Sequence, residues 1–208
     1  MLLDAIVLAG GRSSRLGSVP KGGLVYEQQT LVRRTVAAVS TARRTVVVGE
    51  VAGAPTPDGV LVTREDPPFG GPVAGIAAGL TTLAQAARVP SDHTVVLACD
   101  MPHVARATAA LLEALPQHHD ADGVIAVDHE GRLQPLAAVY RTAALTDAIE
   151  RARQAGRLHG LPVFRLIAGM NLTPVAVPRG STDDIDTWED AAAFGIGAPS
   201  TRATEGEA

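Results

Sequence analysis

Hydrophobic residues in this 208-residue chain form short runs separated by amphipathic segments. Several runs are continuous in valine, isoleucine, leucine and alanine, which is typical of strands buried on both faces. The predicted strands are Leu3–Leu8, Thr45–Val48, Val60–Thr63, Thr94–Cys99, Gly123–Val127, Leu136–Tyr140 and Thr173–Val177. Their alternation with helices predicts an α/β/α arrangement, in which helices cover both faces of a mostly parallel sheet.

Helices are predicted where apolar residues recur every three or four positions between the strands. Thr30 is a candidate cap for the first helix, and Pro72 stands where a second would begin. A third surrounds Leu111, and Ala143–Ala155 forms a fourth. The segment from Thr187 has the pattern of a capping box, with aspartate in place of the usual glutamate, and opens the last helix.

Composition and charge exclude several classes of protein. The net charge is −4 and no stretch is strongly basic, so the footprint of a nucleic-acid binder is missing. No apolar run approaches the roughly 18 residues that span a bilayer. The single cysteine, Cys99, excludes an intrachain disulfide and fits a reducing cytoplasm. We therefore expect one soluble cytoplasmic domain over residues 1–196, followed by a disordered tail over residues 197–208.

The most informative segment is the loop after the first predicted strand. There a buried run stops at Gly10 and Gly11, which allow a ligand to approach the backbone closely. Consecutive N–H groups in such a turn bind anions. Side chains of residues 12–15 add donors, and Lys21 adds a mobile positive charge. The loop fits neither the Walker pattern nor the dinucleotide pattern, which leaves a plain strand–helix turn as the alternative.

Acidic residues follow two other predicted strands. Asp100 ends the run Thr94–Cys99, where a carboxylate is well placed to hold Mg²⁺, although an aspartate before proline can also cap a helix. Asp66 precedes Pro67, which from the residues alone is typical of a turn.

These motifs resemble the molybdenum cofactor guanylyltransferases, the MobA-like branch of the nucleotidyltransferase superfamily. Residues 8–17 match that family's opening Leu-Ala-Gly-Gly, its basic, serine-rich stretch and its Arg-Met-Gly, with Leu16 in place of methionine. Residues 99–102 match its Cys-Asp-x-Pro, and residues 70–76 resemble its Gly-Pro-Leu-Ala-Gly segment. The resemblance extends over roughly residues 3–195.

The resemblance implies a Rossmann-like fold of the nucleotide-diphospho-sugar transferase type. It also implies transfer of GMP from GTP to molybdenum-carrying molybdopterin, with release of pyrophosphate. Mg²⁺ would be bound by Asp100, and Lys21 would act in catalysis with assistance from Arg15. The implied nucleotide-binding residues are Leu8, Ala9, Gly10, Gly11, Lys21, Asp66 and Asp100. The implied partners are the two substrates and, transiently, other molybdenum cofactor enzymes, with the chain a monomer or weak oligomer.

Four further positions depart from the family pattern. Pro20 replaces the usual aspartate, and Gly49 stands where many members have an asparagine that touches the nucleotide. Asp184 and Asp186 replace the two asparagines of Asn-x-Asn, so Asp186 is either a second metal ligand or a helix cap. Pro20, Asp184 and Asp186 favour a cytidylyl- or sugar-phosphate nucleotidyltransferase as the alternative. A non-catalytic nucleotide-binding module is a further alternative, and the missing Gly-x-Gly-x-x-Gly opposes a dinucleotide-dependent oxidoreductase.

Overall fold

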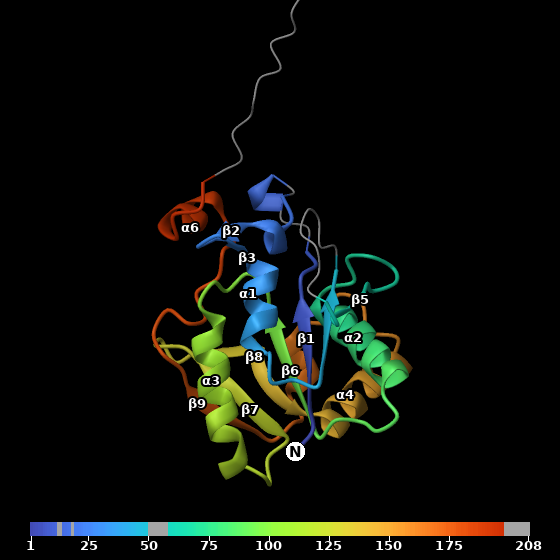
Figure 1. Ribbon diagram of the computed structural model, residues 1–208. Coiled ribbons are helices and arrows are strands. Elements are labelled where there is room, and N and C mark those ends of the chain that lie inside the picture. The colour runs from blue at the N-terminus through green and yellow to red at the C-terminus, as the bar shows by residue number, and fades with distance from the viewer. Residues whose placement is uncertain (12–13, 18, 50–57, 198–208) are drawn as a thin grey trace, which may run out of the picture.

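A seven-stranded sheet lies at the centre of the molecule, as a computed structural model of the chain shows (Figure 1). The structure describes residues 1–11, 14–17, 19–49 and 58–197. The strands are β1 (Leu3–Leu8), β4 (Arg44–Val48), β5 (Leu61–Thr63), β6 (His93–Ala98), β7 (Gly123–Val127), β8 (Leu133–Arg141) and β9 (Leu172–Ala176). Their order across the sheet is β5-β4-β1-β6-β8-β7-β9, and only β8 runs antiparallel to its neighbours. All seven predicted strands and the mostly parallel sheet are confirmed.

The helices are α1 (Leu31–Ala38), α2 (Pro72–Ala86), α3 (Val104–Ala114), α4 (Thr142–Gln154), α5 (Val163–Ile167) and α6 (Trp188–Ala193). The predicted capping box of α6 is present, because the Thr187 hydroxyl accepts a hydrogen bond from the backbone N–H of Asp190 and the Asp190 carboxylate accepts one from that of Thr187. Thr30 does precede α1, but its hydroxyl makes no capping hydrogen bond within the described residues. The five-residue α5 was not predicted.

Alternate side chains of the strands pack against two separate layers of helices. On one face of β1, Ala5 and Val7 belong to a core that includes residues of α1 and α3. On the other face, Ile6 and Leu8 pack with residues of α2, α4 and α5. Both layers are visible in Figure 1. This arrangement explains the continuous apolar runs, because each strand is covered on both sides.

A smaller cap stands over one edge of the sheet, beyond the carboxyl ends of β1 and β6 (Figure 1). It contains the short 3₁₀ turns η1 (Ser14–Leu16) and η2 (Lys21–Gly23), the hairpin of β2 (Val25–Tyr26) and β3 (Gln29–Thr30), and α6. A third 3₁₀ turn, η3 (Leu115–Gln117), follows α3 elsewhere. The cap has its own hydrophobic cluster, formed by Leu16, Leu24, Leu31, Ile185, Ala191 and Ile196. Segments from both ends of the chain therefore meet above the strands.

Some predictions fall outside the described residues. The donors expected at Arg12 and Ser13 lie there, as does the tail expected to be disordered, apart from Gly197. Among the helices that the structure does describe, none combines the length and the apolar character needed to cross a membrane.

The ends of β1 and β4 approach each other unusually closely at Gly49. This residue has φ +119°, and a Cβ atom added to it would lie 2.4 Å from the backbone nitrogen of Gly10. The backbone N–H of Ala9 donates to the carbonyl of Val48 at 2.8 Å, which holds the two segments together. Since any side chain at residue 49 would push against the Gly10 backbone, the family's asparagine does not fit here unless the loop moves.

We expect Gly49→Ala to destabilise the protein more than a positive backbone angle alone would. Gly131→Ala is the matched control, because Gly131 has φ +83° with open space around its Cα. The backbone angle alone should cost roughly 1 to 2 kcal/mol in either variant. Gly49→Ala should exceed its control by at least about 1 kcal/mol in the free energy of unfolding, because backbone atoms must move. Urea denaturation measures the free energy of unfolding of both variants. Equal losses of stability in the two would contradict the close approach of Gly49 to Gly10.

Candidate nucleotide site

A pocket of about 330 Å³ opens at the carboxyl ends of β1 and β6, beneath the cap. Its location agrees with the rule that ligands bind beyond the carboxyl ends of parallel strands. Because β8 runs antiparallel to β6, the beginning of β8 reaches this edge and contributes Leu136. Six of the seven predicted nucleotide-binding residues line the pocket: Leu8, Ala9, Gly10, Gly11, Lys21 and Asp100.

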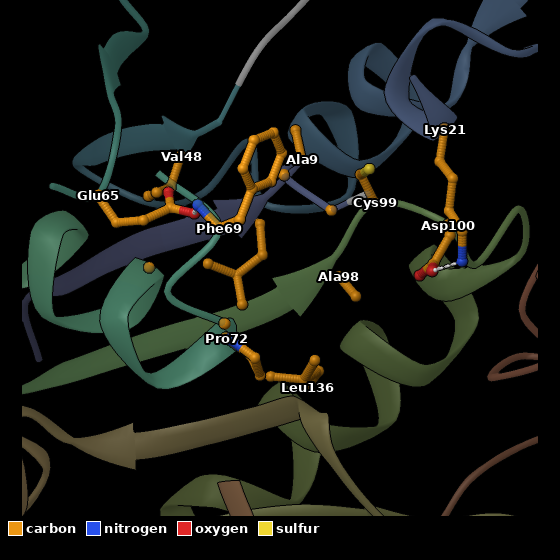
Figure 2. A pocket seen from close by; sticks show the side chains of 15 residues that line it. Ala9, Lys21, Val48, Glu65, Phe69, Pro72, Ala98, Cys99, Asp100 and Leu136 are labelled. Carbon is orange, nitrogen blue, oxygen red and sulfur yellow. Dashed lines mark hydrogen bonds and ion pairs between the residues drawn. The ribbon is translucent and has the colours of Figure 1, made fainter. Parts of the chain in front are cut away.

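One end of the pocket combines apolar walls with a carboxylate. Figure 2 shows the rings of Phe69 and Pro72 and the side chain of Val48 around this end, with Glu65 beside Phe69. One oxygen of the Glu65 carboxylate accepts a hydrogen bond from the backbone N–H of Phe69 at 3.1 Å. An acceptor among flat apolar surfaces suits a heterocyclic base that carries N–H donors.

Asp66 lies elsewhere. Its side chain is exposed and lines a separate hollow that also includes His159 and residues of α2. Glu65, which the sequence interpretation passed over, lines both this hollow and the pocket. Both acids follow β5, so the sequence showed that a carboxylate comes after this strand but not which of two neighbours turns inward.

The other end of the pocket carries the charged groups. The ammonium of Lys21 donates to the carboxylate of Asp100 at 2.8 Å, drawn as a dashed line in Figure 2, and to that of Asp186 at 2.5 Å. The Lys21 and Asp100 side chains are each only 19% exposed. Burial opposes the charge of the ammonium, but the two facing carboxylates outweigh it and raise the pKa of Lys21. Lys21 is therefore a permanent cation in this site.

Three carboxylates gather around this cation. Ligand oxygens of Asp100, Asp184 and Asp186 all lie within 4.8 Å of one another. Burial, followed by the negative charges of Asp100 and Asp186, raises the pKa of Asp184. The backbone N–H of Ile185 donates to the carbonyl of Asp100 at 3.0 Å, so the two carboxylate-bearing segments are joined directly. Hard oxygen donors at this spacing fit a divalent cation such as Mg²⁺, for which the Lys21 ammonium would be a competitor.

The remaining predicted residues have smaller parts in this geometry. Arg15 is 72% exposed, and its guanidinium lies 3.9 Å from the Asp186 carboxylate, on the same edge but outside the pocket lining. Burial raises the pKa of the Cys99 thiol, which therefore stays protonated and packs in the core as expected.

Comparison with known proteins identifies relatives of the whole arrangement. Residues 5–166 match the MobA-like NTP transferase domain. A molybdenum cofactor guanylyltransferase of Acidiphilium cryptum is 31% identical over 192 residues, which cover 90% of this chain and 91% of that protein. One of Cupriavidus pinatubonensis is 31% identical over 170 residues, covering 74% and 78%. A probable molybdenum cofactor guanylyltransferase of Clostridium perfringens is 28% identical over 138 residues, and the match spans 65% of its length.

Solved structures share the fold. Molybdopterin-guanine dinucleotide biosynthesis protein A from Archaeoglobus fulgidus has a TM-score of 0.67 at 22% identity, over 92% of this chain and 96% of that one. The 2-C-methyl-D-erythritol 4-phosphate cytidylyltransferase of Francisella tularensis has a TM-score of 0.73 at 13% identity, over 94% and 99%. The structural match thus extends both to a molybdopterin-guanine dinucleotide biosynthesis protein and to a cytidylyltransferase, whereas the family match covers most of the chain and includes the pocket. The chain belongs to the MobA-like NTP transferase family.

Proposed function

We propose that this protein transfers GMP from GTP to molybdenum-carrying molybdopterin, with Mg²⁺ as its metal. An oxygen of the acceptor phosphate attacks the α-phosphorus of GTP. The bond from that phosphorus to the oxygen bridging to the β-phosphate breaks, and pyrophosphate leaves. The names of the relatives that are 31% identical support this reaction. The fold alone is equally compatible with the cytidylyltransferase alternative.

The observation that carries the proposal is the cation held between two carboxylates at the end of the pocket. Lys21, Asp100 and Asp186 meet there, and Gly10 and Gly11 line the same pocket. The acceptor phosphate is already a nucleophile, so transfer depends mainly on alignment and on neutralisation of charge. The backbone of residues 8–11 would hold the phosphates and Lys21 would stabilise the charge that develops on them.

The metal would be bound by Asp100, with Asp186 as a second ligand. When bound, Mg²⁺ would neutralise the triphosphate and hold its oxygens in place. A relative in fold, Rv0371c of Mycobacterium tuberculosis, has been solved in complex with manganese, which supports a divalent ion at such a site. Since the Lys21 ammonium bridges these same carboxylates, it stands in for that cation. Lys21 would give up these bonds when the metal arrives and turn toward the phosphates.

Glu65 would select the base. Guanine presents adjacent N–H donors on its Watson–Crick edge, and an ionised carboxylate is purely an acceptor. Cytosine offers one donor group beside an acceptor nitrogen, which a carboxylate would repel. The predicted contact of Asp66 with the nucleotide remains a competing assignment.

We further propose that the reaction takes place in the cytoplasm, in a monomer or weak oligomer that contacts other molybdenum cofactor enzymes transiently.

We expect Asp100→Asn to reduce GMP transfer by about 100-fold or more, because the metal loses a charged ligand. Asp92→Asn is the matched control, since Asp92 precedes β6 and Asp100 follows it at the opposite end. Steady-state rates of pyrophosphate release should separate the two variants, while circular dichroism shows both folded. Full activity in the Asp100 variant would remove the central assignment.

Lys21→Met should act in opposite directions on turnover and on metal binding. Turnover should fall by about 100-fold, because a charge that stabilises the transition state is lost. Mn²⁺ binding without nucleotide should become tighter, since no ammonium competes for Asp100 and Asp186. Titration calorimetry with Mn²⁺ measures the second effect. Weaker binding than in the wild type would show that Lys21 does not stand in for the metal.

Base selection can be tested with the neighbouring acids Glu65 and Asp66. Calorimetry with GTP, CTP, UTP and dTTP, with and without Mg²⁺, should show Mg²⁺-dependent binding of GTP alone. Glu65→Gln should weaken GTP binding by about tenfold, the effect of one lost hydrogen bond to a charged group, and Asp66→Asn should leave it unchanged. The reverse pattern would favour Asp66. Tight CTP binding without GTP binding would move the protein to the cytidylyltransferase alternative.

A further inference from the structure

A cluster of three aromatic rings lies in the cap, outside the pocket lining. Tyr26 comes from β2, His103 from the loop before α3, and Phe194 from the end of α6. The ring centroids are 5.6 Å apart for Tyr26 and His103, 5.9 Å for Tyr26 and Phe194, and 5.5 Å for His103 and Phe194, each pair edge to face. Tyr26 Oη and His103 Nε2 lie 3.0 Å apart and share a hydrogen bond.

Each ring lies on a segment that carries one charged group of the site. Tyr26 follows η2, which begins with Lys21, and the backbone N–H of Leu24 donates to the carbonyl of Lys21. His103 closely follows Asp100 in the loop after β6. The three rings therefore belong to three parts of the chain that come together only when the protein folds.

The link from Phe194 to Asp186 runs through α6. The Asp190 carboxylate accepts a hydrogen bond from the backbone N–H of Asp186 at 3.1 Å, and the carbonyl of Asp190 accepts one from that of Phe194. Because α6 is short and capped at its start, a shift of Phe194 would carry Asp186 with it.

Arg34 of α1 ties the cluster to the body of the protein. Its guanidinium carbon lies 4.7 Å from the centroid of the Tyr26 ring, and its Nε donates to the carbonyl of Pro102 at 3.3 Å. An ion pair from the Arg34 guanidinium to the Glu27 carboxylate, at 3.0 Å, fixes the tip of the hairpin. The rings are thus held in place from below by a residue of the main helical layer.

We propose that Tyr26, His103 and Phe194 are positioning residues, which set the distances among Lys21, Asp100 and Asp186 and so the geometry of the metal site. This inference rests on the proposed function. A role in packing alone would require only that the cap stay folded. A role in positioning requires that loss of the Tyr26–His103 hydrogen bond alter the site while the fold persists.

The chain offers a matched pair of variants, because the hydroxyl of each of its two tyrosines takes part in one hydrogen bond. Tyr26→Phe removes the hydrogen bond to His103 and keeps the ring. Tyr140→Phe removes a hydrogen bond of 2.7 Å to the carbonyl of Pro135, within the core beneath β8. Both variants lose one hydrogen bond, but only Tyr26 belongs to the aromatic cluster.

Two measurements on both variants test the proposal. Amide hydrogen exchange at Ile185 reports the bond from its N–H to the carbonyl of Asp100, and calorimetry reports Mn²⁺ affinity. In Tyr26→Phe we expect exchange at Ile185 to accelerate and both Mn²⁺ affinity and kcat to fall by about tenfold, as for groups that orient metal ligands. The KM for GTP should stay within about twofold, because the variant removes no contact that binds GTP equally in the ground state and in the transition state. Tyr140→Phe should change none of these.

The outcomes separate this inference from the proposed function. Unchanged exchange at Ile185 in Tyr26→Phe, or accelerated exchange with wild-type Mn²⁺ affinity, would overturn the positioning role and leave the reaction standing. The same would follow if Tyr140→Phe produced equal effects. If the wild type neither binds Mn²⁺ nor transfers GMP, the proposed function fails, and exchange at Ile185 still decides whether the cluster joins the two segments.

Discussion

The site depends on a single electrostatic constraint, the need to hold several carboxylates together beside a half-buried pocket. Asp100, Asp184 and Asp186 repel one another, and the raised pKa of Asp184 reflects that repulsion together with burial. The Lys21 ammonium, bonded to Asp100 and Asp186, offsets that repulsion. Under the proposed function, the side chain that would contact phosphate therefore also stabilises the carboxylate cluster, so one residue would serve both binding and assembly.

The cap exists because this constraint brings together segments that are distant in sequence. Lys21 comes from near the start of the chain, Asp100 from its middle and Asp186 from near its end. Electrostatic attraction alone fixes distances poorly, since ion pairs at partly exposed positions are weak and screened by salt. The apolar cluster around Leu31 and Ile185 supplies burial beneath the charges, and the ring contacts above it add defined geometry. The same three segments therefore supply the charged side chains of the site and the apolar and aromatic contacts that hold them in place.

Local patterns in the sequence predicted what depends on local physics. Buried strands, the amphipathic helices and the capping box of α6 follow from spacing and side-chain type, and all were found. The pocket followed as well, because strand ends in a parallel sheet share one edge. The sequence did not reveal the β2–β3 hairpin, since each of its strands has only two residues and carries no periodic signal. Nor did it separate Glu65 from Asp66, because the direction of a side chain in an irregular turn is set by its bond to Phe69.

The geometry of the pocket explains the departures from the family pattern at residues 49, 184 and 186. The backbone of Gly49 packs against that of Gly10, and this close approach leaves no room for a side chain at residue 49. Asp184 and Asp186 supply negative charge where amides would be neutral, and the Lys21 ammonium forms an ion pair with the Asp186 carboxylate. Without those aspartates, Lys21 would have Asp100 as its only partner among the carboxylates it now contacts. The aspartate at residue 186 therefore gives Lys21 a second anionic partner, and under the proposed function a metal bound by these carboxylates would have to displace the ammonium.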